Sequence, residues 1–247
     1  MCSYCHPLSR RAFCGGAMTL PLSRIAHRQA SGGVLLEPTL RLTQTSAART
    51  VAITLDACPG HFDHRIADML VARNIPATIT LTAAWMQHNT EGLAFLKSRP
   101  DLFALENHGA QHLPPVLGTE KIYGLTPAGS LAAIRAEVLG GAEAIAAATG
   151  QHPTWYRGAA ALYSPEAIPL IEQLGFRVAG YSLSADEGAS LPAKIVAARM
   201  AAARDGDVII GHINQPKRDS GAGIAIGLAT LQDAGVTFIR LSDLTPA

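Results

Sequence analysis

Residues 51–56, with the sequence VAITLD, form a short apolar run, rich in β-branched residues, that ends in a carboxylate. Such residues favour strands, and a run that is apolar on both faces is typical of a strand inside a covered parallel sheet. A carboxylate at the end of a buried strand costs free energy unless it is paired, hydrogen-bonded or bound to a metal. Asp56 is therefore a candidate functional residue, and its alternative role is to cap the following helix.

From this strand onward, apolar runs alternate with segments of helical spacing. The predicted strands cover residues 51–55, 77–81, 102–105, 155–157, 176–183, 208–213 and 236–241. The predicted helices cover residues 63–74, 90–98, 127–149, 193–203 and 223–234, and another begins at Ser164-Pro165-Glu166. This order predicts an α/β fold with a mostly parallel sheet, and about seven units favour a (β/α) barrel over a long open sheet, although periodicity alone leaves both open.

Composition limits the classes of function. The chain has 247 residues, of which 48% are hydrophobic and 16% charged, enough to bury the core of one large domain. The net charge is +1 and Lys and Arg form no block, so nucleic-acid binding is not expected. No uncharged apolar stretch reaches the roughly 20 residues that span a bilayer.

The N-terminus has a different character. Residues 1–36 contain no Asp or Glu, and residues 9–13 (SRRAF) resemble the start of a twin-arginine export signal, followed by a mildly apolar run. We therefore expect an export signal over residues 1–31, a polar connecting segment over 32–50, a folded domain over 51–247, and a periplasmic or secreted protein. The alternative is a disordered basic extension on a cytoplasmic protein.

Polar and titratable residues follow the predicted strands, which is where α/β folds carry their chemistry. They include Asp56, Asn107, His108, His112, Arg157, Asp186, Glu187 and His212. This recurrence at the strand ends of an apolar chain predicts an enzyme.

His108 and His112 are four residues apart, so on a helical turn both imidazoles reach one ion. Imidazole binds Zn²⁺, Co²⁺ or Ni²⁺, and a carboxylate commonly completes the protein ligands. The alternative is that the two histidines are solvent-exposed and bind no metal. Glu106 and Asn107 could orient the pair through hydrogen bonds.

Asp56 could complete such a site as a metal ligand, or serve as a base. Cys58 faces the same way as Asp56 if the chain stays extended, so it could touch the metal, although a small buried thiol is the commoner role.

Three further strand-end residues could take part in catalysis. Arg157 and Asp186 could form a buried pair that orients a catalytic group, or a purely structural ion pair. His212 could protonate a leaving group, or be a core histidine bonded to a backbone carbonyl.

Taken in order, these segments resemble the polysaccharide deacetylases, a carbohydrate esterase family with a distorted (β/α) barrel. The resemblance covers residues 51–241 and is carried by residues 51–56, 107–112, 156–158 and 209–212. It implies a metal-dependent hydrolase that removes acetyl groups from an N- or O-acetylated carbohydrate by cleaving a non-peptide C–N bond or an ester. It also implies a divalent metal, Zn²⁺ or else Co²⁺ or Ni²⁺, on Asp56, His108 and His112.

The resemblance also implies catalytic roles. Asp56 would be the base and His212 the proton donor, with Arg157 and Asp186 holding them, and a backbone N–H near Ala160 would stabilise the oxyanion.

The chain departs from the family pattern at Ala57, where the family has a second Asp that binds the metal. Asp56 would then move onto the metal, or two histidines and water would hold the metal more weakly, or the protein would bind sugar without hydrolysing it. A silent carbohydrate-binding protein and a hydrolase of a small non-sugar amide are therefore the alternatives. The family prolines are also replaced after Arg157, and Ser184 stands where the family often has Asp.

Overall fold

The computed structural model describes residues 25–30 (backbone only), 33–43 and 48–244. Its strands are β1 (Ile25–Ala30), β2 (Gly33–Pro38), β3 (Thr50–Ala57), β4 (Ala77–Leu81), β5 (Phe103–Asn107), β6 (Trp155–Tyr156), β7 (Arg177–Val178), β8 (Leu183–Ser184), β9 (Val208–His212) and β10 (Thr237–Ile239). Its helices are α1 (His64–Ala72), α2 (Ala83–His88), α3 (Thr90–Lys97), α4 (Leu131–Thr149), α5 (Ala167–Gln173), α6 (Ala193–Ala201) and α7 (Ser220–Asp233). Two short 3₁₀ turns, η1 (Ala159–Ala161) and η2 (Leu241–Asp243), complete the described elements.

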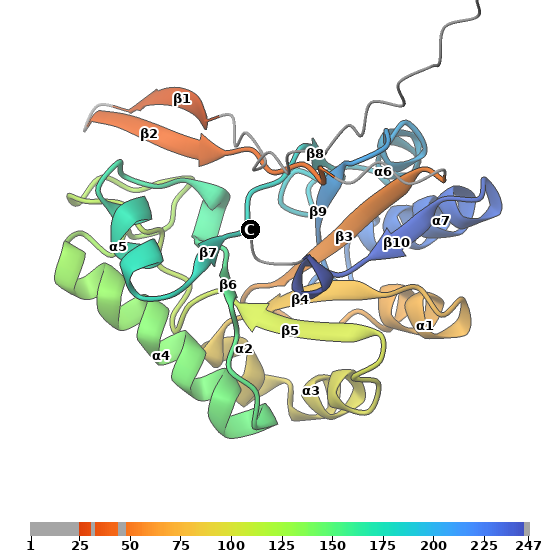
Figure 1. Ribbon diagram of the computed structural model, residues 1–247, viewed down its shortest axis with the longest axis horizontal. Coiled ribbons are helices and arrows are strands. Elements are labelled where there is room, and N and C mark those ends of the chain that lie inside the picture. Colours follow the sequence, from red (N-terminus) through yellow and green to blue (C-terminus); the bar gives the residue numbers. More distant parts are fainter. Residues whose placement is uncertain (1–24, 31–32, 44–47, 245–247) are drawn as a thin grey trace, which may run out of the picture.

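The main sheet is parallel throughout and follows the order β7-β6-β5-β4-β3-β9-β8. β10 pairs with the first residues of β3, on the edge that β4 occupies further along the strand. The sheet curls into a half-barrel with helices around its outside (Figure 1). The predicted distorted barrel of about seven parallel strands is thereby confirmed.

The barrel wall is interrupted between β7 and β8, where the sequence predicts one strand over residues 176–183. The structure corrects this prediction, because the chain bends away at residues 179–182. The Arg157 guanidinium donates the hydrogen bonds that the N–H groups of a neighbouring strand would otherwise supply, from Nε–H to the Ala179 carbonyl (2.9 Å) and from Nη2–H to the Gly180 carbonyl (3.1 Å). A Cβ at Gly180 would lie 2.3 Å from the Pro38 carbonyl oxygen, so only glycine fits there.

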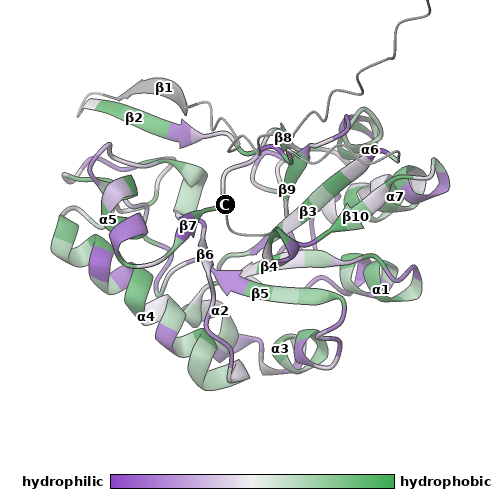
Figure 2. Ribbon diagram, viewed as in Figure 1, coloured by the Kyte–Doolittle hydropathy of each residue, from purple (hydrophilic) through white to green (hydrophobic). Residues whose placement is uncertain are grey.

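Residues 32–50 are more than the expected polar connector. β1 and β2 form an antiparallel hairpin, and β2 is mostly hydrophobic (Figure 2). Leu35 and Leu36 of β2 are buried, and Leu36 exchanges two backbone hydrogen bonds with Tyr163. β2 is therefore built into the domain beside the gap in the barrel wall, and its partner β1 lies within the range predicted as an export signal.

The helices cover the sheet through one large hydrophobic cluster. Strand residues Ile53, Leu55 and Ile79 pack there with Ile66 of α1 and Ile224 of α7. No helix in the described part of the chain is both long and apolar enough to span a membrane.

Two predicted helices begin later than expected, and one observed helix was not predicted. α4 begins at residue 131, because the Ser130 hydroxyl caps it by accepting the Ala133 N–H. α5 begins at residue 167, because the Ser164 hydroxyl accepts the Leu117 N–H instead of capping. The sequence prediction omits α2, a six-residue helix capped by Thr82.

Candidate active site

The parallel strands bring the predicted site residues to one end of the half-barrel. In the strand register, Asp56 of β3 is opposite His212 of β9 on one side and Thr80 of β4 on the other. Asn107, the last residue of β5, pairs with Tyr156 of β6, so the loops that carry His108 and Arg157 begin side by side. The arrangement follows from parallel pairing, because the C-terminal ends of all these strands lie at the same edge.

Asp56 is buried, and its Oδ1 accepts two hydrogen bonds. The Thr80 hydroxyl donates over 2.5 Å and Arg157 Nη1–H over 2.9 Å. Burial alone would raise the pKa of this carboxyl, but the charges of Arg157, His108 and His212 outweigh it and hold the pKa well below its ordinary value. Asp56 is therefore ionised at neutral pH, and its Oδ2 lies 3.9 Å from His108 Nε2.

Arg157 is completely buried and satisfies its guanidinium within the barrel. Besides the two carbonyls of the bend, it donates to the Thr54 hydroxyl (2.8 Å) and to Asp56. The expected pair between Arg157 and Asp186 does not form, because each residue has a different partner. Arg157 fixes the orientation of the Asp56 carboxylate and satisfies two backbone carbonyls at the interruption between β7 and β8.

Asp186 is fully buried after β8 and binds His212 through both oxygens. Oδ1 accepts from His212 Nδ1 and Oδ2 from the His212 backbone N–H, each over 2.9 Å. Burial alone would lower the pKa of His212, but the Asp186 carboxylate outweighs it and raises the pKa well above its ordinary value. His212 is thus held protonated, with Nδ1 committed to Asp186 and Nε2 available to donate a proton.

His108 and His112 do not lie on a helical turn, which corrects the local structure predicted for them. They sit on a loop after β5, in which His112 has a positive φ of 65°. Their rings nevertheless come together, with centroids 5.0 Å apart. His108 Nδ1 lies 2.7 Å from the Arg157 carbonyl, and because a carbonyl only accepts, Nδ1 carries a proton and Nε2 faces the site.

The loop is held from behind by Glu137 of α4. Its carboxylate accepts the backbone N–H groups of Gln111 (2.9 Å) and Leu113 (3.1 Å), on both sides of His112. Gly109 has a φ of 93°, and a Cβ there would lie 2.3 Å from Glu137 Oε1. The histidine loop therefore depends on close contact with a buried acid of the helix behind it.

The two polar residues before His108 behave differently from each other. Asn107 supports the loop, since its Oδ1 accepts the Gly109 N–H (2.8 Å). Glu106 does not support it, because its carboxylate accepts the N–H groups of Thr154 and Trp155. The expected orienting role therefore applies to Asn107 alone.

Cys58 lies among the histidines. Its Sγ is 3.3 Å from His108 Nε2, and one donor atom each from Cys58, His108 and His112 lies within 4.8 Å of the other two. We call these three residues the donor cluster. Burial alone would raise the pKa of the thiol, but the imidazoles of His108, His112 and His212 outweigh it and lower the pKa well below its ordinary value.

The donor cluster fits a divalent metal by its chemistry. Thiolate sulfur and imidazole nitrogen are the preferred ligands of Zn²⁺, and the three donor atoms lie within 4.8 Å of one another. Burial would lower the pKa of His108, but Asp56 and Cys58 raise it to about 9, so the surroundings favour a positive charge at this place. A metal cation would supply that charge in place of the proton.

The turn after Arg157 has an unusual backbone. Ala160 and Ala161 have φ values of 62° and 51°, a left-handed conformation that costs free energy for residues other than glycine. Strain of this kind concentrates at functional sites, and this turn follows directly on the residue that anchors Asp56.

Sequence reasoning missed two of the contacts described above and underrated a third residue. Thr80 and Glu137 had no predicted role, and Cys58 was expected to act more as a buried hydrophobe than as a ligand. A signal existed for Glu137, because it lies on the buried stripe of α4 with Ile134 and Val138, where an acid needs a reason. No signal existed for Thr80, whose role depends on strand register.

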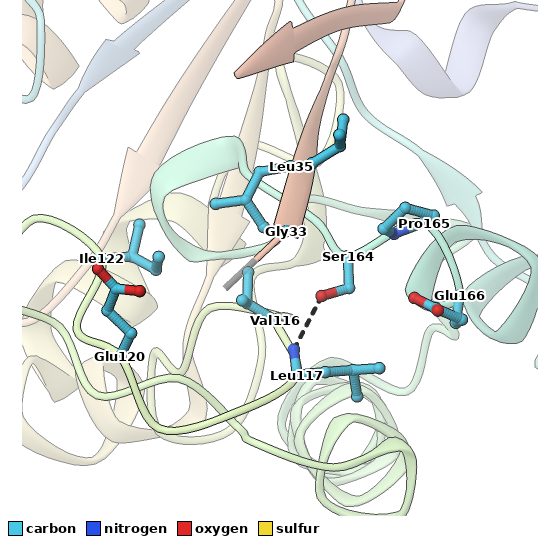
Figure 3. A pocket seen from close by; sticks show the side chains of 10 residues that line it. Gly33, Leu35, Val116, Leu117, Glu120, Ile122, Ser164, Pro165 and Glu166 are labelled. Atoms are coloured by element: carbon cyan, nitrogen blue, oxygen red, sulfur yellow. Dashed lines mark hydrogen bonds between the residues drawn. The ribbon is translucent and has the colours of Figure 1, made fainter. Parts of the chain in front are cut away.

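A separate cavity of about 220 Å³ lies beneath β2 (Figure 3). Its lining comes from residues 33–35, 116, 117, 120, 122 and 164–166, and the Leu117–Ser164 hydrogen bond crosses its wall. None of the candidate catalytic residues lines it, so it is distinct from the site described above.

Residues 43–179, more than half of the chain, match the sequence model of a family described as polysaccharide deacetylase. The chain belongs to the polysaccharide deacetylase family. No curated protein matches the sequence.

Several solved structures share the fold. A family 4 acetyl xylan esterase from Clostridium thermocellum, in complex with a cobalt ion, has 22% identity and a TM-score of 0.63, over 79% of this chain and 89% of that one. A family 4 carbohydrate esterase from Streptomyces lividans, in complex with acetate, has 17% identity and a TM-score of 0.62, over 78% and 93%. A family 4 pseudoenzyme from Bacillus anthracis has 18% identity and a TM-score of 0.63, over 81% and 66%.

Ala57 is the position after β3's Asp56 at which this sequence departs from the family pattern. Its methyl group is fully buried in the main hydrophobic cluster. The side chains that reach the site from this strand end are those of its two neighbours, Asp56 and Cys58.

Proposed function

We propose that this polysaccharide deacetylase family member is a metal-dependent hydrolase that removes acetyl groups from an N- or O-acetylated carbohydrate. The observation that carries the proposal is the convergence of three functional pieces at one end of the barrel. These are an ionised Asp56 held by Arg157, a His212 held by Asp186, and the donor cluster between them.

His108 and His112 would hold the metal, and either Asp56 or Cys58 could complete the protein ligands. A bound Zn²⁺ ion would supply Lewis acidity toward the acetyl carbonyl. Asp56 presents Oδ2 toward this place while Thr80 and Arg157 occupy Oδ1, so it is oriented to accept a proton from the attacking water. A backbone N–H near Ala160 would stabilise negative charge on the substrate oxygen, since the N–H groups of Gly158 and Ala161 already donate to the Tyr163 hydroxyl and the Gly158 carbonyl.

His212 would complete the reaction as proton donor. The Asp186 carboxylate fixes its Nδ1 and keeps the ring protonated, which leaves Nε2–H for the departing amine or alcohol. Asp186 is completely buried, whereas 15% of the His212 side chain is exposed, so the ring is anchored in the core while part of it remains accessible to a substrate.

The proposal is tested by acetate release from acetylated chito-oligosaccharides and acetylated xylan, using full-length protein supplied with Zn²⁺. We expect the double substitution His108→Ala, His112→Ala to reduce acetate release by about 10³-fold and to abolish stoichiometric zinc. His152→Ala, at an exposed histidine, is the matched control and should change neither. No acetate from either substrate class with zinc bound would reject the deacetylase proposal.

The second candidate is a carbohydrate-binding protein without catalytic activity. It is favoured by the presence of Ala57 in place of the family's second aspartate. The Bacillus anthracis pseudoenzyme shares the fold, and a mutant of it is described as having restored enzymatic activity. Oligosaccharide binding by calorimetry without acetate release would favour this candidate.

We also infer that the protein is exported, from the arginine-containing N-terminus. That segment lies outside the described residues apart from β1. Cell fractionation and N-terminal sequencing test this inference, and a full-length cytosolic chain would reject it.

A further inference from the structure

We propose that the Cys58 thiolate is the third protein ligand of the metal, so that the site is a Cys-His-His centre and Asp56 stays off the ion. This inference rests on the proposed function and specifies the chemistry of that same site. It assigns to Cys58 the ligand role that the sequence predicted for Asp56.

Geometry favours Cys58 over Asp56. The sulfur lies 3.3 Å from His108 Nε2, and the three donors of the cluster lie within 4.8 Å of one another. Asp56 Oδ2 lies farther from His108 Nε2, at 3.9 Å, and Asp56 does not belong to that group of three. Ligand atoms that share one tetrahedral Zn²⁺ ion, at about 2.0–2.3 Å from it, lie between three and four ångströms apart, so the cysteine–histidine distance already suits a common ion.

Asp56 is committed elsewhere. Its Oδ1 accepts from Thr80 and Arg157, and the buried Arg157 guanidinium balances its charge. Moving this carboxylate onto the metal would weaken a buried ion pair, which is costly in free energy. The Cys58 sulfur instead contacts His108, a member of the same donor cluster, so binding the metal would not separate it from an arginine partner as it would Asp56.

The backbone places the thiol where the ion would be. Asp56 and Cys58 both approach His108 Nε2, at 3.9 and 3.3 Å, as expected for alternate residues of an extended chain, while Ala57 between them is packed in the hydrophobic cluster. Asn214 Nδ2–H donates to the carbonyls of Cys58 and Pro59, each over 3.0 Å, which fixes the loop after β3. The backbone that carries the thiol is therefore fixed by Asn214, which lies in the loop that follows β9.

A Cys-His-His ligand set has consequences for metal choice. Thiolate and imidazole favour Zn²⁺ or Co²⁺ and disfavour hard ions such as Mg²⁺ or Ca²⁺. Three protein ligands leave the fourth tetrahedral position open, which is the arrangement of catalytic zinc sites.

The experiment uses Co²⁺ as a spectroscopic probe, because a thiolate bound to Co²⁺ gives a charge-transfer absorption band in the near ultraviolet. The starting protein is the full chain carrying Cys2→Ser, Cys5→Ser and Cys14→Ser, in which Cys58 is the remaining thiol among the four cysteines of the sequence. We expect this variant to bind one Co²⁺ with the band. Adding Cys58→Ser should abolish the band, and adding Cys58→Asp should abolish it while Co²⁺ is still bound.

Stoichiometric Co²⁺ without the band in the starting protein would overturn the inference, as would a band that survives Cys58→Ser. If the Cys58→Ser chain does not fold, alkylation of Cys58 in the starting protein decides the matter. Protection by Zn²⁺ that a chelator reverses supports ligation, and an unchanged alkylation rate overturns it. Acetate release is scored separately: a thiolate band without acetate rejects only the deacetylase function, and acetate without the band rejects only the cysteine ligand.

Discussion

The acid–base pairs and the donor cluster occupy the same end of the barrel but are held in different ways. In the acid–base pairs, Asp56–Arg157 and Asp186–His212, each charged group bonds a partner from another strand end at 2.9 Å. In the donor cluster, the three side chains face one another and are anchored mainly through the backbone of their loops. The difference teaches that buried charges must be satisfied by the protein itself, whereas metal ligands are positioned from behind and completed by an ion.

The largest effect on this contrast is expected when the cation of the Asp56–Arg157 pair is removed. Arg157→Met leaves a buried carboxylate unpaired and two carbonyls of the barrel bend without donors. We expect the free energy of unfolding to fall by about 3–5 kcal/mol, measured by urea denaturation. Lys194→Met, at an exposed residue of α6, is the control and should change stability by less than about 0.5 kcal/mol.

The same variant has a predicted pH dependence. Because the pKa of Asp56 is lowered in the folded protein, its contribution is fully present above the unfolded-state pKa of about 3.9 and is lost as the pH falls toward the folded-state value. The stability difference between wild type and Arg157→Met should therefore narrow below about pH 4. A difference that stays constant down to acid unfolding would contradict the assigned pair.

Asp186→Asn gives an intermediate effect, confined to the second pair. We expect kcat to fall by about 10- to 100-fold, because an amide orients the imidazole less well and no longer stabilises its charge. The pKa of His212 should drop without the carboxylate that raises it. Since the protonated form is lost as pH rises through that pKa, the alkaline limb of the kcat profile should move to lower pH.

Glu187→Gln is the matched control for this prediction, because Glu187 is the neighbouring carboxylate but is exposed and pairs with Arg199 at the surface. Its pH profile should match that of the wild type. An Asp186→Asn enzyme with an unshifted alkaline limb would mean that His212 does not act as the proton donor.

Glu137→Gln is expected to give the smallest effect, because it disturbs only the loop that carries the histidines of the donor cluster and leaves both acid–base pairs intact. In the wild type, the backbone N–H groups of Gln111 and Leu113 donate to the Glu137 carboxylate. A glutamine would place its own NH₂ donor beside them, so the histidine loop should lose order. We expect Zn²⁺ affinity to fall by about tenfold, measured by chelator competition. Glu143→Gln, on the exposed side of the same helix, should leave the affinity unchanged, and equal losses in both variants would show that the helix, not the loop contact, matters.

Much of the fold was predictable because buried parallel strands are nearly continuous apolar runs. The strand at residues 77–81 and the helix around Ile66 and Leu70 follow from local pattern alone. The break between β7 and β8 was not predictable, since it depends on a guanidinium that comes from residue 157. The β1–β2 hairpin was also missed, because its leucines find their partners more than 100 residues away, at residues such as Tyr163.

By itself the sequence determined the residue types at the strand ends, and with them the chemistry available: three imidazoles, a thiol, carboxylates and a guanidinium. Only the tertiary structure decided which of them meet. It paired Arg157 with Asp56 rather than with Asp186, and it brought Cys58 to the histidines. The physical reason is that hydrogen bonds and metal sites require distances of a few ångströms between side chains from different strands, and these distances are set by strand register and loop anchoring rather than by spacing along the chain.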